Sequence, residues 1–135
     1  MSTVMNPGAA PDPEAVDEAV YRLLELVPAG TVISYGAAAA ELGLGTARRP
    51  ASAMSRAPDG LPWWRMVRAN GTLAPSLAAR AEGAWRREGT PVVGQGSAAK
   101  AARAAFFVPD DAWRRALTSR LSDLVNALPE IGETQ

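Results

Sequence analysis

The sequence contains neither cysteine nor histidine in its 135 residues. Without cysteine there can be no disulfide, thiolate metal site or thiol nucleophile. Without histidine the chain lacks the most common general base and the most common metal ligand. Carboxylates, hydroxyls, tyrosines and a single lysine are the only groups left for catalysis. The composition therefore argues against an enzyme and predicts no catalytic residue, metal site or cofactor.

Long apolar runs are also missing. No stretch approaches the roughly 20 residues that span a bilayer, and residues 1–15 have neither the basic nor the apolar region of a signal peptide. These features predict a cytoplasmic protein with no membrane partner. A chain of this length is expected to fold as one domain that buries its core without metal or disulfide support.

Net charge is zero overall but unevenly distributed. Residues 1–45 carry one arginine against six acids, residues 46–87 carry eight arginines against two acids, and residues 88–135 carry five basic residues against six acids. A basic middle third in a neutral chain indicates a surface that faces a polyanion. A compositional bias toward arginine and alanine explains the same excess, so charge alone does not decide between the two.

The N-terminal third predicts a tail followed by a helix. Residues 1–12 are small, proline-rich and without periodicity, as in a flexible tail. Asp12 before a proline is a helix start, and apolar residues recur at helical spacing up to Val27. The structured domain is expected to span residues 13–128, with a second flexible tail over 129–135.

Two short helices and a hairpin are predicted next. Ser34 can cap a helix that ends at Gly43, and a short turn leads to a third helix over about 47–56. This pair has the outline of a helix-turn-helix. The Asn70-Gly71 pair between β-prone residues predicts a hairpin over 63–73, which would form a small wing.

Two further helices follow in the C-terminal half. Ser76 is expected to cap one that ends before Gly89, and another from Asp110 places five large apolar side chains on one face over 113–128. The predicted fold class is mainly α: a single domain of winged helix-turn-helix type, with a small β-hairpin and an additional C-terminal helix.

Three segments together resemble the DNA-binding domain of the O6-alkylguanine-DNA alkyltransferases. They are VYRLLELVPAGTVISYG at 20–36, ARR at 47–49 and PWWRMVRANGTL at 62–73. Their order and spacing match that family's amphipathic helix, Pro-x-Gly, Ser/Thr-Tyr pair, Ala-Arg and Pro-Cys-His-Arg motifs, and the resemblance extends over roughly residues 16–113. In the last motif Trp63 stands where the family has its reactive cysteine. Such a replacement is typical of the alkyltransferase-like proteins, which the chain therefore resembles.

The resemblance implies a binding site without chemistry. An alkyltransferase needs a thiolate to accept the alkyl group, and an indole is a poor nucleophile. The flat face of Trp63 can instead line a pocket for an extruded base. By the same resemblance Tyr35 pushes the nucleotide out of the helix. The resemblance also implies that Arg48 enters through the minor groove to fill the vacated stack, a role that suits a planar, permanently charged guanidinium. Taken singly, the three residues also fit a core aromatic, a buried corner tyrosine and a solvated arginine.

Further residues are expected around these three. At the DNA surface we predict Tyr35, Arg48, Arg49, Ser52 and Arg65, and in the lesion pocket Trp63, Tyr35, Arg68 and Ser76.

Two departures from the family pattern affect these predictions. Pro50 fits a helix only in its first turn, so the recognition helix is expected to begin one or two residues late. Ser76 stands where related short proteins have an arginine that contacts the modified guanine. Arg80 or Arg68 would have to replace that arginine, and otherwise the discrimination against unmodified guanine should be weaker.

The function implied by the resemblance is non-enzymatic recognition of DNA damage. A nucleoid-associated monomer would bind O6-alkylguanine in duplex DNA through the minor groove, flip the base into a pocket lined by Trp63 and mark the site for nucleotide excision repair proteins. The alternative is a winged helix-turn-helix transcriptional regulator that reads the major groove as a dimer, joined by the apolar face of its C-terminal helix. A catalytic alkyltransferase is the least supported, because neither a thiol nor an imidazole is present.

Overall fold

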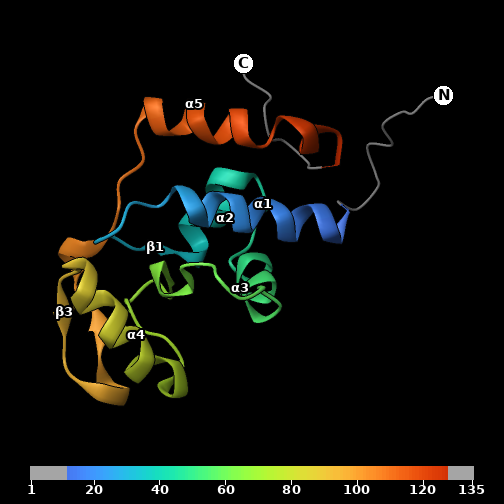
Figure 1. Ribbon diagram of the computed structural model, residues 1–135. Helices are drawn as coiled ribbons and strands as arrows, with labels where there is room; N and C mark the ends of the chain where they lie inside the picture. The colour runs from blue at the N-terminus through green and yellow to red at the C-terminus, as the bar shows by residue number, and fades with distance from the viewer. Residues whose placement is uncertain (1–11, 128–135) are drawn as a thin grey trace.

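Helices and very short strands make up residues 12–127, the part of the chain that the structure, a computed structural model, describes (Figure 1). Leu128 and the two predicted tails lie outside this part, except for Asp12. None of its helices is both long and apolar enough to cross a bilayer. The elements confirm a mainly α fold. They are α1 (Pro13–Leu26), β1 (Ile33–Ser34), α2 (Tyr35–Leu42), α3 (Arg48–Ser55), η1 (Trp63–Arg65), β2 (Met66–Val67), α4 (Pro75–Glu88), β3 (Val92–Val93), η2 (Gly96–Ala98), β4 (Lys100–Ala101), η3 (Arg103–Ala105), α5 (Asp111–Arg120) and η4 (Ser122–Ala127), where η marks a 3-10 helix.

The first helix boundaries follow from local chemistry. The Asp12 carboxylate accepts a hydrogen bond from the Glu14 amide at 3.0 Å and begins α1. The Ser34 hydroxyl accepts one from the Ala37 amide at 3.0 Å and begins α2, and Gly43 ends α2 in the left-handed conformation at φ 68°. These boundaries confirm the sequence predictions.

The third helix begins at Arg48, one residue after Ala47, which provides no side-chain cap. Pro50 is buried in the first turn, where its missing N–H would have had no acceptor within the helix. The proline is therefore accommodated while Arg48 remains the first helical residue.

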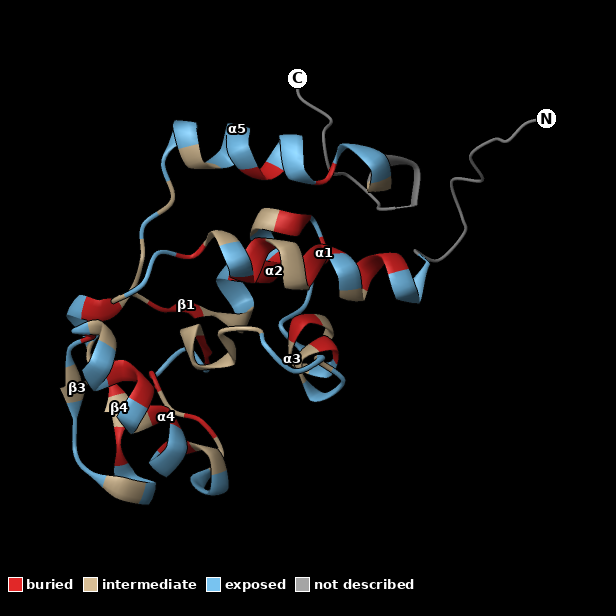
Figure 2. Ribbon diagram, viewed as in Figure 1, coloured by how far each residue is buried: buried red, intermediate tan, exposed pale blue. Residues whose placement is uncertain are grey.

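Two apolar clusters form the core, and Figure 2 shows that their buried residues follow the inner faces of the helices. In the first, α1 contributes Val20, Leu23 and Leu24, which are fully buried against α2, α3 and α5. The second surrounds the fully buried Trp85 of α4 and includes Val67 of β2. The segment 61–67 runs between the two clusters and joins them.

The strands pair differently from the prediction. β2 lies parallel to β1, with Ile33 opposite Met66 and Ser34 opposite Val67. The Asn70-Gly71 turn does form, but no strand follows it. The hairpin predicted over 63–73 is therefore wrong, and the small antiparallel hairpin of this fold is instead β3 with β4.

Burial explains this difference. Met66 and Val67 are both fully buried, so their strand lies inside the domain rather than projecting as an exposed wing. The turn that follows docks on β4, because the Ala101 amide donates to the Gly71 carbonyl at 2.9 Å. Gly71 has φ 87°, and a Cβ there would collide with the backbone oxygen of Ala101. Only glycine fits this close approach.

Two helix predictions in the C-terminal half also need correction. α4 begins at Pro75 after Ala74, so Ser76 lies inside the first turn and does not cap the helix. α5 ends at Arg120 instead of continuing to 128, and the chain tightens into η4. The end of α4 at Gly89, which is left-handed at φ 78°, is as predicted.

The C-terminal helix packs along α1, on the side away from α3 and α4 (Figure 1). Leu117 and Leu121 are buried against α1, and the Trp113 indole donates to the Leu26 carbonyl at 2.9 Å. The apolar face of α5 is therefore covered by the chain's own first helix. Within residues 12–127 it does not offer the dimer surface that the transcriptional regulator requires.

Candidate functional site

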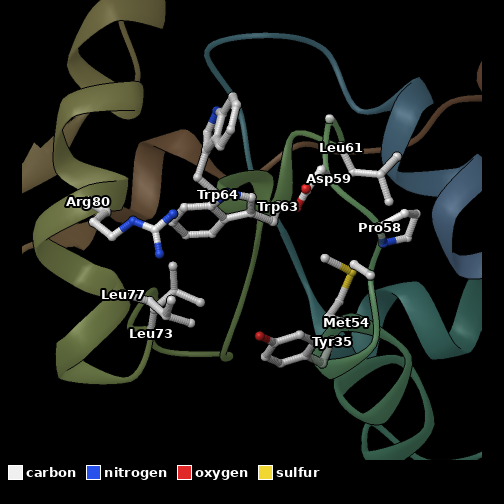
Figure 3. A pocket seen from close by; sticks show the side chains of 12 residues that line it. Tyr35, Met54, Pro58, Asp59, Leu61, Trp63, Trp64, Leu73, Leu77 and Arg80 are labelled. Carbon is white, nitrogen blue, oxygen red and sulfur yellow. The ribbon is translucent and has the colours of Figure 1, made fainter.

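A cleft of about 490 Å³ opens between α4 on one side and the segment from α3 to η1 on the other (Figure 3). This volume is within the range of small-ligand sites. The lining side chains are mostly apolar, with one tyrosine hydroxyl, one carboxylate and one guanidinium among them. They include Tyr35, Met54, Asp59, Trp63, Leu77 and Arg80.

Trp63 lies at the centre of the cleft because η1 turns tightly after Pro62. Its ring meets that of Trp64 edge to face, with the centroids 5.6 Å apart and the planes at 81°. The backbone here is anchored, since the Trp64 carbonyl accepts a hydrogen bond from the buried Trp85 indole at 2.7 Å. A half-buried aromatic face is thus held in position for a flat apolar ligand.

Tyr35 is the first residue of α2, and its hydroxyl is directed into the cleft (Figure 3). The parallel pairing of β1 with β2 brings the start of α2 next to the strand that follows η1, which is why Tyr35 and Trp63 share one cleft. Burial raises the pKa of Tyr35, and the positive charge of Arg68 offsets part of this rise. At neutral pH the hydroxyl is therefore neutral and able to donate a hydrogen bond.

Arg48 and Arg49 stand at the start of α3, and neither forms an ion pair with any residue of the described part. Positive side chains at a helix N-terminus oppose the helix dipole, so fold stability does not account for them. The same arrangement concentrates positive potential and attracts phosphate. Ser52 is exposed one turn further on, and its hydroxyl accepts a hydrogen bond from Arg56 at 2.9 Å.

Arg65 points away from this surface and into the protein. Its side chain, 16% exposed, pairs with that of Glu88, 15% exposed, with Nε 3.0 Å from Oε1. It also donates to the Val27 carbonyl at 3.0 Å, and Glu88 accepts from the Gly30 amide at 3.3 Å. Burial raises the pKa of Glu88, but the hydrogen bonds that the carboxylate accepts, those from Arg65 first, outweigh burial and leave that pKa below its usual range.

The guanidinium of Arg65 is thus committed to a largely buried ion pair that joins η1, α4 and the end of α1. This corrects the prediction that Arg65 lies at the DNA surface. Its position next to the tryptophans in the sequence is explained by a structural role.

Arg80 is the arginine that lines the cleft, with its guanidinium carbon 5.3 Å from the centroid of the Trp63 ring. The two predicted pocket residues Arg68 and Ser76 do not line it. Arg68 is exposed and donates to the Thr72 hydroxyl at 3.4 Å, and Ser76 is exposed in the first turn of α4. Of the two arginines considered as replacements for the family's arginine, only Arg80 faces the cleft.

Sequence reasoning missed most of the apolar wall. Met54 and Leu61 flank an irregular loop, and no periodicity links them to Trp63. A usable signal existed on α4, where Leu77 and Arg80 are three residues apart and therefore share a face. Within residues 12–127 no three acidic side chains gather in a way that could hold a metal ion. The cleft offers an aromatic face and apolar walls to a flat ring.

Comparison with known proteins identifies the family of the chain and structures that share its fold. The family model described as the 6-O-methylguanine DNA methyltransferase DNA-binding domain matches residues 15–90. No curated protein matches the chain.

Two crystal structures from S. pombe share the fold. The first is ATL in complex with DNA, with 22% identity and a TM-score of 0.61, and the match covers 71% of this chain and 97% of that one. The second is Atl1 in complex with damaged DNA containing O6-carboxymethylguanine, with 23% identity, a TM-score of 0.62 and the same coverage. Because the family model spans more than half of the chain, the protein belongs to the family of the 6-O-methylguanine DNA methyltransferase DNA-binding domain.

Proposed function

We propose that the protein is a non-enzymatic, alkyltransferase-like sensor of DNA damage that binds O6-alkylguanine in duplex DNA. The observation that carries this proposal is the cleft in which Trp63, Tyr35 and Arg80 converge, in a family whose members act on this lesion, but in a chain without a thiol. An aromatic, mostly apolar cleft of this size suits a flipped base. The S. pombe Atl1 structure, which contains O6-carboxymethylguanine, supports the same ligand class.

The groups in the cleft favour binding without reaction. Alkyl transfer requires a nucleophile to accept the alkyl carbon, and the cleft offers an indole, a neutral phenol and a carboxylate. The raised pKa of Tyr35 makes its phenolate scarce at neutral pH. The protein therefore keeps the lesion intact and acts by marking it.

The surface beside the cleft suits entry from the minor groove. Arg48 and Arg49 place unpaired positive charge at the start of α3, where DNA phosphates can be bound. In this binding mode Arg48 fills the gap left by the extruded base. Tyr35 pushes against the phosphate of the flipped nucleotide. Unstacking a base costs a few kcal/mol, and less where alkylation has already weakened the pair. Lesion selectivity begins with this difference and is completed by contacts in the cleft.

The wider role is inferred from the same binding mode. A bound, unrepaired lesion needs a second system to remove it, and we propose transfer to nucleotide excision repair proteins. The protein would act as a monomer on the nucleoid in the cytoplasm. Coverage of the apolar face of α5 by α1 supports the monomer over the dimeric regulator.

The decisive experiment is a titration of two duplexes of one sequence, with guanine or O6-methylguanine at one position, at fixed ionic strength. Base contacts and stacking are each worth about 1–3 kcal/mol, so we expect at least about tenfold tighter binding to the lesion. A 2-aminopurine next to the lesion should brighten as the stack opens. Equal affinity for the two duplexes would refute the proposal, and a strong preference for one undamaged sequence would favour the regulator.

A further inference from the structure

Arg80 brings an unpaired positive charge to the apolar side of the cleft formed by α4. In Figure 3 its guanidinium lies beside the Trp63 ring, above Leu77. No residue within 12–127 forms an ion pair with it, whereas Arg86 on the same helix pairs with Glu82 at 2.8 Å. A guanidinium that lies against an indole keeps the N–H donors at its edge available. No hydrogen bond within the described residues uses these donors, so they are available to a ligand.

The chemistry of a purine indicates which part of the ligand meets this wall. The O6 position is on the side of guanine far from the glycosidic bond, so a flipped guanine enters a cleft with O6 and its substituent leading. A ring that packs on Trp63 then brings that substituent next to Arg80, which is the cation in the cleft lining. A carboxylate on the substituent can accept two hydrogen bonds from the guanidinium, and such charge-assisted bonds are about twice as strong as neutral ones.

We infer that the cleft prefers guanines whose O6 substituent is an anion, the carboxyalkyl class, over neutral substituents of the same size. The inference rests on the proposed function and defines its substrate class. Arg80 is exposed, so water screens part of the attraction. The expected preference is about fivefold, which corresponds to about 1 kcal/mol.

Asp59 provides the opposing charge in the same cleft. It comes from the loop after α3 and lies on the other side of Trp63 from Arg80 (Figure 3). A carboxylate on the substituent is repelled from that side and attracted to α4. Asp59→Asn should therefore increase the affinity for the anionic lesion and leave the affinity for a neutral one within about twofold.

The test compares duplexes that contain O6-carboxymethylguanine or O6-carbamoylmethylguanine, which differ in charge but hardly in size. Wild type should bind the carboxymethyl duplex about fivefold tighter at low salt, and the ratio should fall as salt is added. Arg80→Met keeps the length of the side chain and should bring the ratio to one or below, because Asp59 still repels the carboxylate, and Arg80→Lys should restore part of the preference. Arg87→Met is the matched control, because Arg87 is an exposed arginine of α4 about 10 Å further along the helix and outside the cleft.

Two outcomes overturn the inference. They are a wild-type ratio of one or less, and a ratio that Arg80→Met and Arg87→Met change equally. Circular dichroism of each variant shows whether it is folded. The O6-methylguanine duplex distinguishes a failure of this inference from a failure of the proposed function. If wild type prefers it over guanine but shows no carboxymethyl preference, the inference alone fails; if it shows no preference for any lesion, the proposed function fails.

Discussion

Replacing Arg65 by methionine tests the strongest structural claim about the tryptophan segment. The side chain pairs with Glu88 and also donates to the Val27 carbonyl, so it joins η1, α4 and the end of α1. Methionine keeps the apolar stem of arginine and removes its donors. The variant leaves the Glu88 carboxylate largely buried without its ionic partner, while the Gly30 amide still donates to it.

The expected loss of stability follows from burial. Removing one partner of a fully buried ion pair costs about 3–5 kcal/mol, because the other charge stays buried without compensation. Both side chains here retain some contact with water, at 16% and 15% exposure. We therefore expect the free energy of unfolding to fall by about 2–3 kcal/mol at neutral pH. An exposed pair would contribute less than about 1 kcal/mol.

The pH dependence distinguishes this mechanism from a simple loss of packing. In the wild type the pKa of folded Glu88 lies below 4.5, so its stabilisation is present above about pH 4.5 and is lost as the pH falls through the folded value. Without Arg65, the largest remaining influence on the folded pKa is burial, which raises it, so we expect that pKa to be higher than in the wild type. The carboxyl then destabilises the fold once the pH rises past its unfolded pKa. The difference between wild type and Arg65→Met should be largest at neutral pH and shrink at low pH.

Urea unfolding at neutral and acidic pH, followed by tryptophan fluorescence, measures both quantities. Glu88→Gln should be less destabilising than Arg65→Met, and the double variant should show that the two effects are not additive. A loss below about 1 kcal/mol, or an equal loss at both pH values, would contradict the buried ion pair. Weakened DNA binding with unchanged stability would instead restore Arg65 to the DNA surface.

Three further outcomes are expected. Arg48→Ala should weaken binding to the damaged duplex by about tenfold in a fluorescence anisotropy titration and reduce its salt dependence by about one counterion, with stability unchanged; Arg115→Ala on α5 should do neither, and equal effects would contradict the assignment. Trp63→Cys should acquire no label from radioactively methylated DNA, since the cleft holds no imidazole to activate the thiol, and measurable transfer would show that the thiol alone suffices. Gly71→Ala should lower the free energy of unfolding by at least about 2 kcal/mol, because the strain of a positive φ and the clash with the Ala101 backbone add. Gly45 is also left-handed but has open space around it, so Gly45→Ala should cost only about 1 kcal/mol. Similar losses in the two variants would rule out the clash with Ala101.

Much of the helical layout could be predicted from the sequence, because helix boundaries depend on contacts within four residues. Asp12 and Ser34 begin their helices through hydrogen bonds to amides two or three residues further on, and Gly43 ends its helix through its own positive φ. One failure came from a long-range pairing and the other from a competing local signal. The Asn-Gly turn was real, but a turn does not specify which distant strand Met66 joins. Ser76 has a capping side chain, yet Pro75 already begins the helix.

The composition by itself excluded a cysteine thiol as alkyl acceptor. The motif around Trp63 indicated where an aromatic site would lie. Only the tertiary structure decided which arginine is paired within the fold and which lines the cleft. Arg65 and Arg80 have the same side chain, but their surroundings differ: Arg65 pairs with Glu88, and Arg80 lies against Trp63 in the lining of the cleft. Such pairings join elements far apart in the chain, and they are set by how α4 packs against η1. A periodicity or a motif cannot determine that packing, because it records neighbours along the sequence and not across the fold.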